Sequence, residues 1–471
     1  MRRLLALSMA LGLLAACGGG GGAPSPPSPP PPPPPPVNQA PAFTSGSSVA
    51  IVENSGGVIH RATATDPEGA AIAFSIVGGA DAGRFSIAAN GDLSFVAPPN
   101  FDLPTDSDLN NIYLVEIGAS DGQIRTNQTV SVTVSNSKEG VSVRRVGTGF
   151  VQPETIFAVS DKLLLVGERN GTIYTFNSHT GGRQILVQVD PIGQALLAVA
   201  AAPDFATTGR LFVLYILNQS LVAREYVRNS TGATVPSSSG PLFAEWAPKY
   251  SGGGWLTFGP DGNLLIGTSD AGGADDPTGS AQNDSSFLGK VIRVTPNPNP
   301  SAGPILTRIA KGLHNPHGGF AYSGGLLFGD RGATVADEVN FLPAGASGSN
   351  LGWPFKEGSK VVRGTPPSDV VDPVTEYALV QYAGLGVVGG AIGGDYLASI
   401  NGHYVFADRT GAIFSFPIAS LPNARTATES RTLDFAPDVG AMDQIRAVVA
   451  DPLGRLYILD GDGEIFRVDV G

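Results

Sequence analysis

The sequence predicts an all-β protein in which a six-bladed β-propeller follows a small β-sandwich, and three observations indicate this fold. The chain holds 63 glycines and 38 prolines among 471 residues and is still 42% hydrophobic, a composition rich in turns that can nevertheless fold. Short alternating apolar segments fill residues 37–136, as they do in sandwiches. Residues 141–471 then repeat one unit of turns and strands, which is typical of propellers. Long helices are not expected.

A short apolar segment begins the chain. Two arginines precede the apolar run 4–16, which has the charged start of a secretory signal and is too short to span a membrane as a mature helix. The run ends in Leu-Ala-Ala-Cys at Cys17, and this ending resembles the bacterial lipoprotein box. The resemblance implies a signal peptide at 1–16 and a lipidated Cys17 that anchors the protein to a membrane. An ordinary signal peptide with an incidental cysteine is the alternative.

Residues 17–36 form a linker of low complexity. Glycines follow Cys17, and eight consecutive prolines occupy 29–36, a tract that forms a stiff, extended polyproline rod. Because Gly18 rather than an acidic residue follows the cysteine, the lipoprotein resemblance implies the outer membrane of a Gram-negative bacterium. We therefore expect an exported lipoprotein on a stalk, facing the periplasm or the cell surface.

Residues 37–136 form the predicted sandwich, in which short apolar segments alternate with turns of Gly, Asp and Asn. The segment contains, in order, "VEN" at 52–54, "ATDPEG" at 64–69, "PNFD" at 99–102 and "VEIGASDG" at 115–122. These motifs resemble a bacterial cadherin-like repeat.

The cadherin-like resemblance implies calcium binding by acidic residues on loops, since calcium takes oxygen ligands. Carried over motif by motif, the candidate ligands are Glu53, Asp66, Glu68 and Asp102. The closing motif of the repeat reads "SNSKEG" at 135–140 and lacks ligands that the resemblance would supply. The alternative is that these carboxylates are solvated turn residues.

Residues 141–471 carry an internal repeat that decides the architecture. Each unit has a glycine or aspartate turn, a short apolar strand, a second turn and another strand, and units start about 50 to 80 residues apart, as four-stranded blades do. The six units begin at Asp161, Gly209, Gly262, Gly324, Gly402 and Gly454. A closed ring of six blades leaves no long open sheet edge.

Ordered motifs in the same region resemble one enzyme family. They are "FGPDGNLLIGTSDAGGADDP" at 258–277, "AQNDSSFLGKVIRV" at 281–294, "GLHNPHGGF" at 312–320, "GDRGATVADEVN" at 329–340, "NLGWP" at 350–354 and "GHYVFADRTGAIFSF" at 402–416. Together they resemble the glucose/sorbosone dehydrogenase family. The resemblance implies a propeller enzyme that oxidises aldoses with pyrroloquinoline quinone and calcium and passes electrons to a respiratory acceptor.

The catalytic base departs from the family pattern. Where the resemblance places a histidine shortly before the "FGPDG" turn, this chain has Ser251, and a hydroxyl is a far weaker base than imidazole near neutral pH. The aspartate that would orient that histidine is retained as Asp270. His314 or His317 could substitute as the base from another blade, or they could line a pocket and bind loop carbonyls.

The residues expected to hold the cofactor also match the family pattern only in part. The family's Arg-Asn pair becomes His314 and Asn315, and its C-terminal basic pair becomes Gln444 and Arg446. Arg409 could offer a compensating charge for the quinone carboxylates.

Calcium at the cofactor would take backbone carbonyls, which the resemblance matches to Gly332 and Ala333, beside the acidic Asp337 and Glu338. Carbonyl ligands tolerate changes of side chain. Arg331 directly precedes them, and its charge opposes a divalent ion unless the anionic quinone lies between.

Charge and motifs exclude some functions. The net charge of −12 without a basic cluster excludes nucleic acid as an expected partner, and no histidine pair has the HExxH spacing of zinc proteases.

Two hypotheses about the function remain. The first is a lipid-anchored sugar dehydrogenase. The second is a propeller that has lost catalysis and binds a sugar, polysaccharide or protein on a calcium-binding neck. Another propeller chemistry, such as lactone hydrolysis, also stays open.

Overall fold

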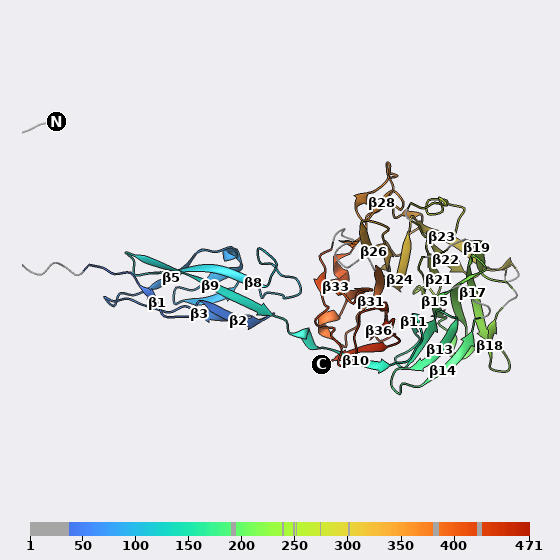
Figure 1. The fold of residues 1–471 in the computed structure, drawn as a ribbon, viewed down its shortest axis with the longest axis horizontal. Coiled ribbons are helices and arrows are strands. Elements are labelled where there is room, and N and C mark those ends of the chain that lie inside the picture. The colour runs from blue at the N-terminus through green and yellow to red at the C-terminus, as the bar shows by residue number, and fades with distance from the viewer. Residues whose placement is uncertain are drawn as a thin grey trace, which may run out of the picture.

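The computed structural model of the chain describes residues 37–189, 195–237, 240–247, 250, 252–273, 275–299, 302–379, 386–421 and 426–471. The predicted signal peptide, Cys17 and linker, and Ser251, lie outside the described residues. The predicted fold class is confirmed, because a small sandwich precedes a six-bladed propeller (Figure 1).

The sandwich has two main sheets, with strand orders β2-β9-β8-β5 and β3-β7-β6, and a small β1-β4 pair. Along β8, Tyr113, Val115 and Ile117 are fully buried while the residues between them turn outward, which is the period-two pattern of a half-buried strand. The strands are β1 (Ala42–Phe43), β2 (Ser48–Val52), β3 (Val58–Arg61), β4 (Ala64–Thr65), β5 (Ala73–Gly78), β6 (Phe85–Ile87), β7 (Asp92–Phe95), β8 (Ile112–Ser120) and β9 (Arg125–Ser135).

Six sheets of the propeller, numbered here as blades 1 to 6, follow the predicted units. Blade 1 holds β11 (Pro153–Ala158), β12 (Leu163–Glu168), β13 (Thr172–Asn177) and β14 (Arg183–Gln188); blade 2 holds β15 (Ala195–Ala201), β16 (Leu211–Leu217), β17 (Ser220–Arg228), β18 (Thr234–Pro236) and β19 (Phe243–Trp246); blade 3 holds β20 (Gly254–Phe258), β21 (Leu264–Thr268), β22 (Lys290–Thr295), β23 (Ile305–Lys311) and β27 (Ser349–Asn350). Blade 4 holds β24 (Asn315–Tyr322), β25 (Gly325–Arg331), β26 (Ala336–Pro343) and β30 (Thr375–Ala378); blade 5 holds β31 (Val387–Ile392), β32 (His403–Asp408), β33 (Ile413–Pro417) and β34 (Glu429–Ser430); blade 6 holds β35 (Ile445–Ala450), β36 (Leu456–Asp460), β37 (Ile465–Val470) and β10 (Val141–Gly147).

The ring closes between its two ends. β10 precedes blade 1 in the chain but pairs antiparallel with β37 in blade 6, with Val141 opposite Val470. The first strands of the blades contact one another around the ring, from β11 through β15, β20, β24, β31 and β35 back to β11. These six strands therefore surround the axis of the propeller.

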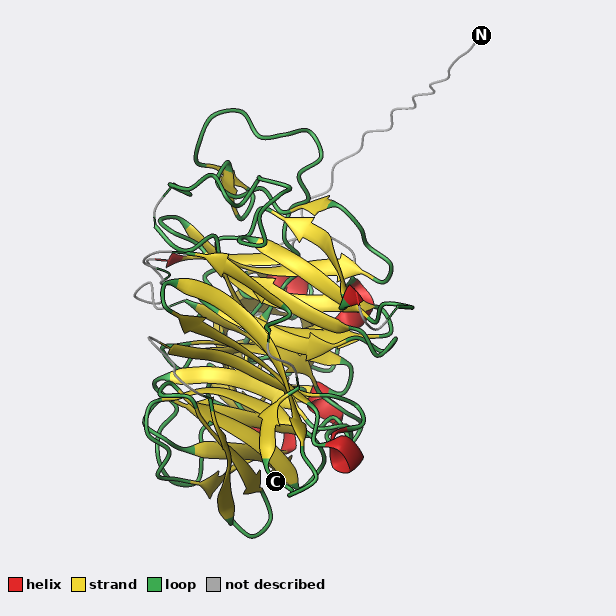
Figure 2. Cartoon of the chain, turned by 90° about the vertical axis from the view of Figure 1, so that its right-hand side faces the viewer, coloured by secondary structure: helices red, strands yellow, loops and turns green. Residues whose placement is uncertain are grey.

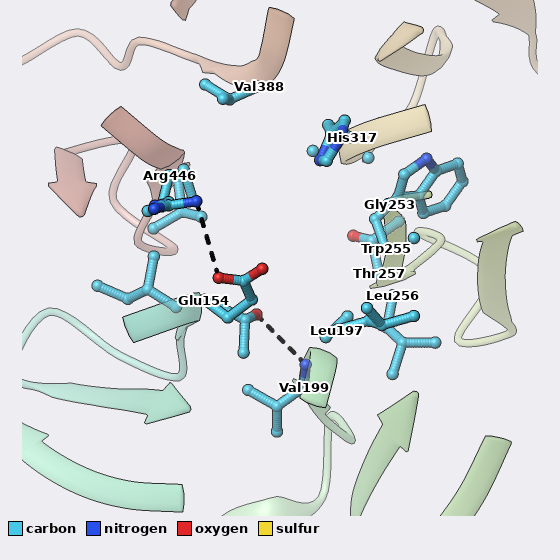
Figure 3. A pocket seen from close by; sticks show the side chains of 18 of the residues that line it. Glu154, Leu197, Val199, Gly253, Trp255, Leu256, Thr257, His317, Val388 and Arg446 are labelled. Atoms are coloured by element: carbon cyan, nitrogen blue, oxygen red, sulfur yellow. Dashed lines mark hydrogen bonds and ion pairs between the residues drawn. The ribbon is translucent and has the colours of Figure 1, made fainter. Parts of the chain in front are cut away.

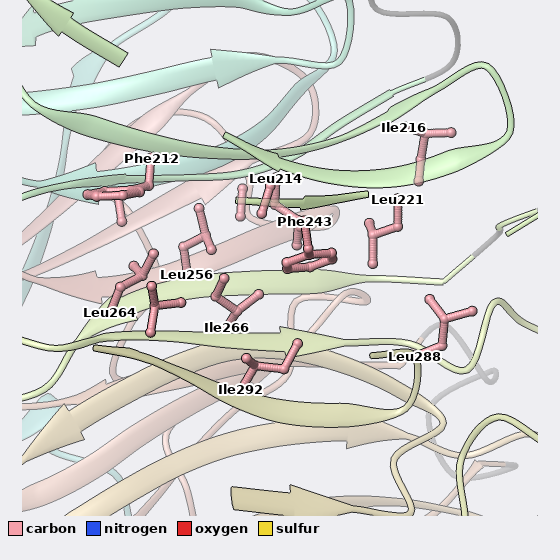
Figure 4. Close-up of a cluster of buried hydrophobic side chains, with 14 of the residues drawn as sticks. Phe212, Leu214, Ile216, Leu221, Phe243, Leu256, Leu264, Ile266, Leu288 and Ile292 are labelled. Carbon is pink, nitrogen blue, oxygen red and sulfur yellow. The ribbon is translucent and has the colours of Figure 1, made fainter. Parts of the chain in front are cut away.

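Blades pack on one another through apolar side chains. Between blades 2 and 3, Phe212 and Leu214 meet Leu256, Leu264 and Ile266 (Figure 4). Burial of such side chains is the main stabilising contribution to the ring.

Helices are short throughout the described part of the chain (Figure 2), and none of them is long and apolar enough to cross a membrane. They are α1 (Phe205–Thr208) and the 3-10 segments η1 (Ala82–Arg84), η2 (Lys138–Gly140), η5 (Ala398–Ile400) and η6 (Ile418–Ser420); a small hairpin pairs β28 (Lys356–Glu357) with β29 (Lys360–Val361).

Candidate functional site

A cavity of about 630 Å³ lies on the propeller axis. The first strands of all six blades contribute to its wall, so the cavity depends on closure of the whole ring. Apolar side chains such as Leu197 and Val388 form part of the wall beside polar ones (Figure 3).

Four arginines line this cavity: Arg169, Arg331, Arg409 and Arg446. Three of them belong to one repeated feature. Each directly follows an acidic residue that lies at or next to the end of the second strand of its blade. The acidic residue bonds backbone N–H groups of its own blade: Asp330, for example, accepts from the amides of His314 (3.0 Å) and Asn315 (2.6 Å). The Glu168-Arg169, Asp330-Arg331 and Asp408-Arg409 pairs thus place their guanidinium groups at the axis.

Glu154 on β11 is the one carboxylate among the described residues that line the cavity. Its oxygens lie 3.2 Å from Arg169 and 3.9 Å from Arg446 (Figure 3). With one carboxylate against four guanidinium groups, the described residues of the lining carry an excess of three positive charges in a chain whose net charge is −12. A concave site of one sign attracts ligands of the other sign, so this cavity suits an anion.

His317 on β24 lines the same cavity and packs against Gly253, where an added Cβ would lie 2.4 Å from its Cε1. A bulge in β24 between His317 and Phe320 sets this placement. The bulge needs glycine because Gly318 has a φ of +58° and an added Cβ would lie 2.3 Å from the Val388 carbonyl oxygen.

The His317 ring makes no hydrogen bond within the described part of the chain, and it is surrounded by positive charge. Burial, followed by the charges of Arg409, Arg331 and Arg446, lowers the pKa of His317 well below its usual value of 6.5. The imidazole is therefore neutral at pH 7 and has a ring nitrogen able to accept a proton.

Asn315 and Tyr250 position the glycines opposite His317. The amide N–H of Gly253 donates to the side-chain oxygen of Asn315, and the Tyr250 hydroxyl donates to the Gly253 carbonyl at 2.5 Å. At Gly252 an added Cβ would lie 1.9 Å from the Ser269 hydroxyl. The two glycines are therefore required for the wall of the cavity to run this close to neighbouring side chains.

Asp270 and His314 do not line the cavity. Asp270 is fully buried, and its carboxylate accepts from the Trp353 indole (2.8 Å) and the Gly272 amide (2.8 Å); burial raises its pKa. The ring of His314 packs against Trp353 in a tilted arrangement with centroids 4.4 Å apart, and its Nδ1 lies 2.7 Å from the Arg331 carbonyl oxygen. Both residues lie behind the wall of the cavity and pack against the residues that form it. Of the two candidate substitute bases, only His317 faces the axis.

The residues expected to hold calcium at the cofactor are placed elsewhere. Gly332, Ala333 and Asp337 are not among the described residues that line the cavity, and neither is Gln444, which was expected near the quinone carboxylates. The Asp337 carboxylate accepts from the amides of Gly332 (3.0 Å) and Val387 (3.2 Å), and burial raises its pKa to about 6.

Glu338 is similarly occupied, since it bonds the Asn340 side chain and the Gly358 amide. Calcium takes roughly six to eight oxygen ligands, whereas the described lining offers a single carboxylate, already paired with arginine. The described side chains of the lining therefore do not by themselves form a calcium site.

The four candidate calcium ligands of the sandwich fall into two separate places. Asp66 closes a turn through the amides of Glu68 (3.0 Å) and Ala70 (2.9 Å), and Glu68 bonds Gln39 near the start of the described chain. Glu53 and Asp102 lie at the opposite end of the sandwich, which faces the propeller (Figure 1). The structure does not bring the four carboxylates together.

Arg169 and Glu154 are lining residues that the sequence reasoning missed. The "GERN" of blade 1 repeats the acidic-arginine pair of "GDRG" and "ADRT", so comparison of the blades could have identified Arg169. No local signal marks Glu154, whose role depends on strand β11 reaching the axis.

The fold and the site together define a class of protein. It is a six-bladed propeller with a cationic axial cavity that also contains a neutral histidine and suits a small anionic molecule. The family model of the glucose/sorbosone dehydrogenases matches residues 150–467, which is most of the chain. The chain belongs to the glucose/sorbosone dehydrogenase family, and its propeller is that of a sugar-dehydrogenase-like protein.

Solved structures of other proteins share the fold of the propeller. The PQQ-bound form of an aldose sugar dehydrogenase from Streptomyces coelicolor has 22% sequence identity and a TM-score of 0.56, over 71% of this chain and 99% of that one. The PQQ domain of a pyranose dehydrogenase from Coprinopsis cinerea has 15% identity and a TM-score of 0.50, over 70% and 95% of the two chains. The HIPL2 protein of Arabidopsis thaliana is 37% identical over 93 residues. That match spans 18% of this chain and 13% of the plant protein.

Proposed function

We propose that the protein is an exported aldose dehydrogenase that uses pyrroloquinoline quinone, abbreviated PQQ. The observation that supports this most is the cationic axial cavity with its neutral His317. The family and the names of the two PQQ-containing neighbours agree with it.

The residues of the cavity fit this cofactor. PQQ is a planar tricarboxylate, and the described residues that line the cavity carry a matching excess of three positive charges. The Arg446 Nε is buried with no hydrogen-bond partner in the described part of the chain, an arrangement that favours an anionic acceptor. Arg331, Arg409 and Arg446 would hold the carboxylates, and the apolar side chains of the wall would contact the ring. When bound, the quinone supplies a two-electron acceptor for the sugar carbon.

His317 supplies the base in this proposal. Its neutral imidazole accepts the proton of the sugar hydroxyl, while Gly253 and the Asn315 that holds it fix one side of the ring. Burial and, after it, the three nearby guanidinium groups lower the pKa of His317 and keep the ring unprotonated before substrate arrives. The arginines also supply positive charge beside the cofactor, so the proposal contains no calcium step at this cavity.

Turnover across an aldose panel tests the proposal. Purified protein is mixed with PQQ and an artificial electron acceptor in excess EDTA, and dye reduction is followed for each sugar. Sugar-dependent reduction of the dye is expected. Absence of turnover with every aldose, both in EDTA and with added calcium, at cofactor concentrations that saturate binding, would refute the enzymatic function.

A second function is favoured by one observation. Asp270, which the family resemblance would use to orient a histidine, instead bonds Trp353. A propeller without catalysis that binds a carbohydrate or a protein is consistent with this. Binding of PQQ or a sugar without turnover would support this alternative.

We also propose that Cys17 is lipidated and anchors the protein to the outer membrane, with electrons passing to a respiratory acceptor. The support is the Leu-Ala-Ala-Cys ending of the apolar run and the proline tract after it. Metabolic labelling with a tagged fatty acid should mark the wild-type protein and leave Cys17→Ser unmarked. Labelling of Cys17→Ser would refute the assignment.

A further inference from the structure

Acidic side chains of both domains gather where the sandwich meets the propeller. Asp102 is the last residue of the "PNFD" loop of the sandwich, Glu139 lies in the short segment η2 between the domains, and Asp434 belongs to the propeller after β34. One carboxylate oxygen of each lies within 4.8 Å of the others. Asp102 is 6% exposed, and its Oδ2 has no hydrogen-bond partner in the described part of the chain.

A guanidinium group already contacts this cluster. Arg431, on the propeller, is 1% exposed. Its NH1 lies 2.7 Å from Glu139 and its Nε lies 2.8 Å from Asp434, and NH1 is also 3.6 Å from Glu429. A cation therefore contacts two of the three clustered carboxylates, Glu139 in the segment between the domains and Asp434 on the propeller.

Glu53, the remaining carboxylate at this end of the sandwich, is already occupied. One oxygen accepts from the amide of Phe101 (2.8 Å), and the other accepts from the amide (2.9 Å) and hydroxyl (3.2 Å) of Ser137. Calcium needs several oxygens directed at one point. The set implied by the cadherin-like resemblance therefore does not form.

We propose that the Arg431 guanidinium is the resident cation of the joint between sandwich and propeller, in the place of a metal ion. The propeller itself supplies the positive charge that holds Glu139 and Asp434 together, so the two domains keep one relative position without calcium. A buried charge is retained in this way only when partners surround it.

Other polar contacts bridge the same joint. The Asn136 side chain donates to Asp434 (2.7 Å), Asn100 donates to Glu429 (3.2 Å), and the Ser430 amide donates to the Asp102 carbonyl (3.1 Å). Because these contacts surround the Arg431 pairs and span both domains, they restrict rotation of the sandwich against the propeller.

Thermal unfolding of the full chain in excess EDTA and in millimolar calcium tests the proposal. Wild-type protein should have the same Tm in both. Arg431→Ala exposes the acidic cluster to its own repulsion, so its Tm should be lower by several degrees in EDTA and should rise on addition of calcium. Arg467→Gln is the matched control, because Arg467 pairs with Asp469 within blade 6; its Tm should not respond to calcium.

Small-angle X-ray scattering gives a second readout of the joint. The maximum dimension of the wild type should be unchanged by EDTA. A second variant, Glu139→Gln, covers the case in which Arg431→Ala does not fold. It removes one partner of Arg431 and keeps the arginine. Its scattering should show a wider spread of domain positions, and added calcium should not narrow that spread. A wild-type Tm that falls in EDTA and recovers in calcium would overturn the proposal. So would an Arg431→Ala protein whose Tm does not respond to calcium, or a Glu139→Gln protein that scatters as the wild type does.

Discussion

At the scale of single residues, His317 carries the proposed chemistry. Replacement by glutamine keeps a polar side chain of similar length but removes the base. We expect His317→Gln to lower kcat about 10²–10⁴-fold, the usual contribution of a general base, and to change PQQ affinity little. Stopped-flow kinetics and equilibrium titration measure the two quantities. A variant with full kcat would assign the base to another group.

The pH profile reports the same residue. Burial and three arginines lower the pKa of His317 well below 6.5, and the base must be unprotonated. The acid limb of kcat/KM should therefore fall below pH 6.5, with the rate lost as the pH drops through the lowered pKa. A limb at or above 6.5 would contradict the surroundings described for His317.

Arg446 tests the anion site. Hydrogen bonds to charged groups contribute roughly 1.5–3 kcal/mol, so Arg446→Gln should weaken PQQ binding by roughly ten-fold to a hundred-fold, and added salt should weaken the wild type further. Isothermal titration measures both effects. Arg467→Gln, away from the cavity, serves as the control and should bind PQQ as the wild type does.

The sequence identified part of this site. Asn315, His317, Arg331, Arg409 and Arg446 are among the expected residues that line the cavity. Asp270 and His314 were expected there but lie behind its wall. The sequence around Asp270 and His314 does not reveal that they lie behind the wall, because both contact Trp353, which is far from them in the sequence.

At the scale of elements, the bulge in β24 sets the direction of His317. Gly318→Ala places a Cβ 2.3 Å from the Val388 oxygen at a φ of +58°. We expect a cost of more than about 1 kcal/mol and a lower kcat, measured by thermal unfolding and by turnover. Gly345→Ala is the matched control: its φ is +79° but nothing lies within 4 Å of the added Cβ. Equal effects of the two variants would mean that backbone strain alone, and not the close approach, acts at Gly318.

The sequence predicted those strands that are specified by residues close together in the chain. The second strand of each blade, such as β12 and β25, lies inside a predicted unit, because an apolar run between two turns specifies a strand without distant partners. Two features escaped local reasoning. The sequence gives no sign that β10 pairs with β37, or that β27 joins blade 3 from a position after blade 4 begins, since pairing over such separations depends on the closed ring.

At the scale of the whole molecule, the described part of the chain is divided into a neck, which is the sandwich, and a head, which is the propeller. The sandwich extends away from one side of the propeller (Figure 1), and the joint at Arg431 holds that arrangement. The cadherin-like resemblance predicted calcium in the neck from short motifs. It could not predict that Asp66 and Asp102 lie at opposite ends of the sandwich, or that the propeller brings Asp434 close to Asp102.

The central claim is that the axial cavity binds PQQ through arginines rather than through a calcium ion. Isothermal titration of PQQ into the protein in excess EDTA tests it most directly. The account predicts saturable binding of one PQQ per chain that addition of calcium does not strengthen and that salt weakens. No binding in EDTA together with binding in calcium would contradict it and would return a metal ion to the site.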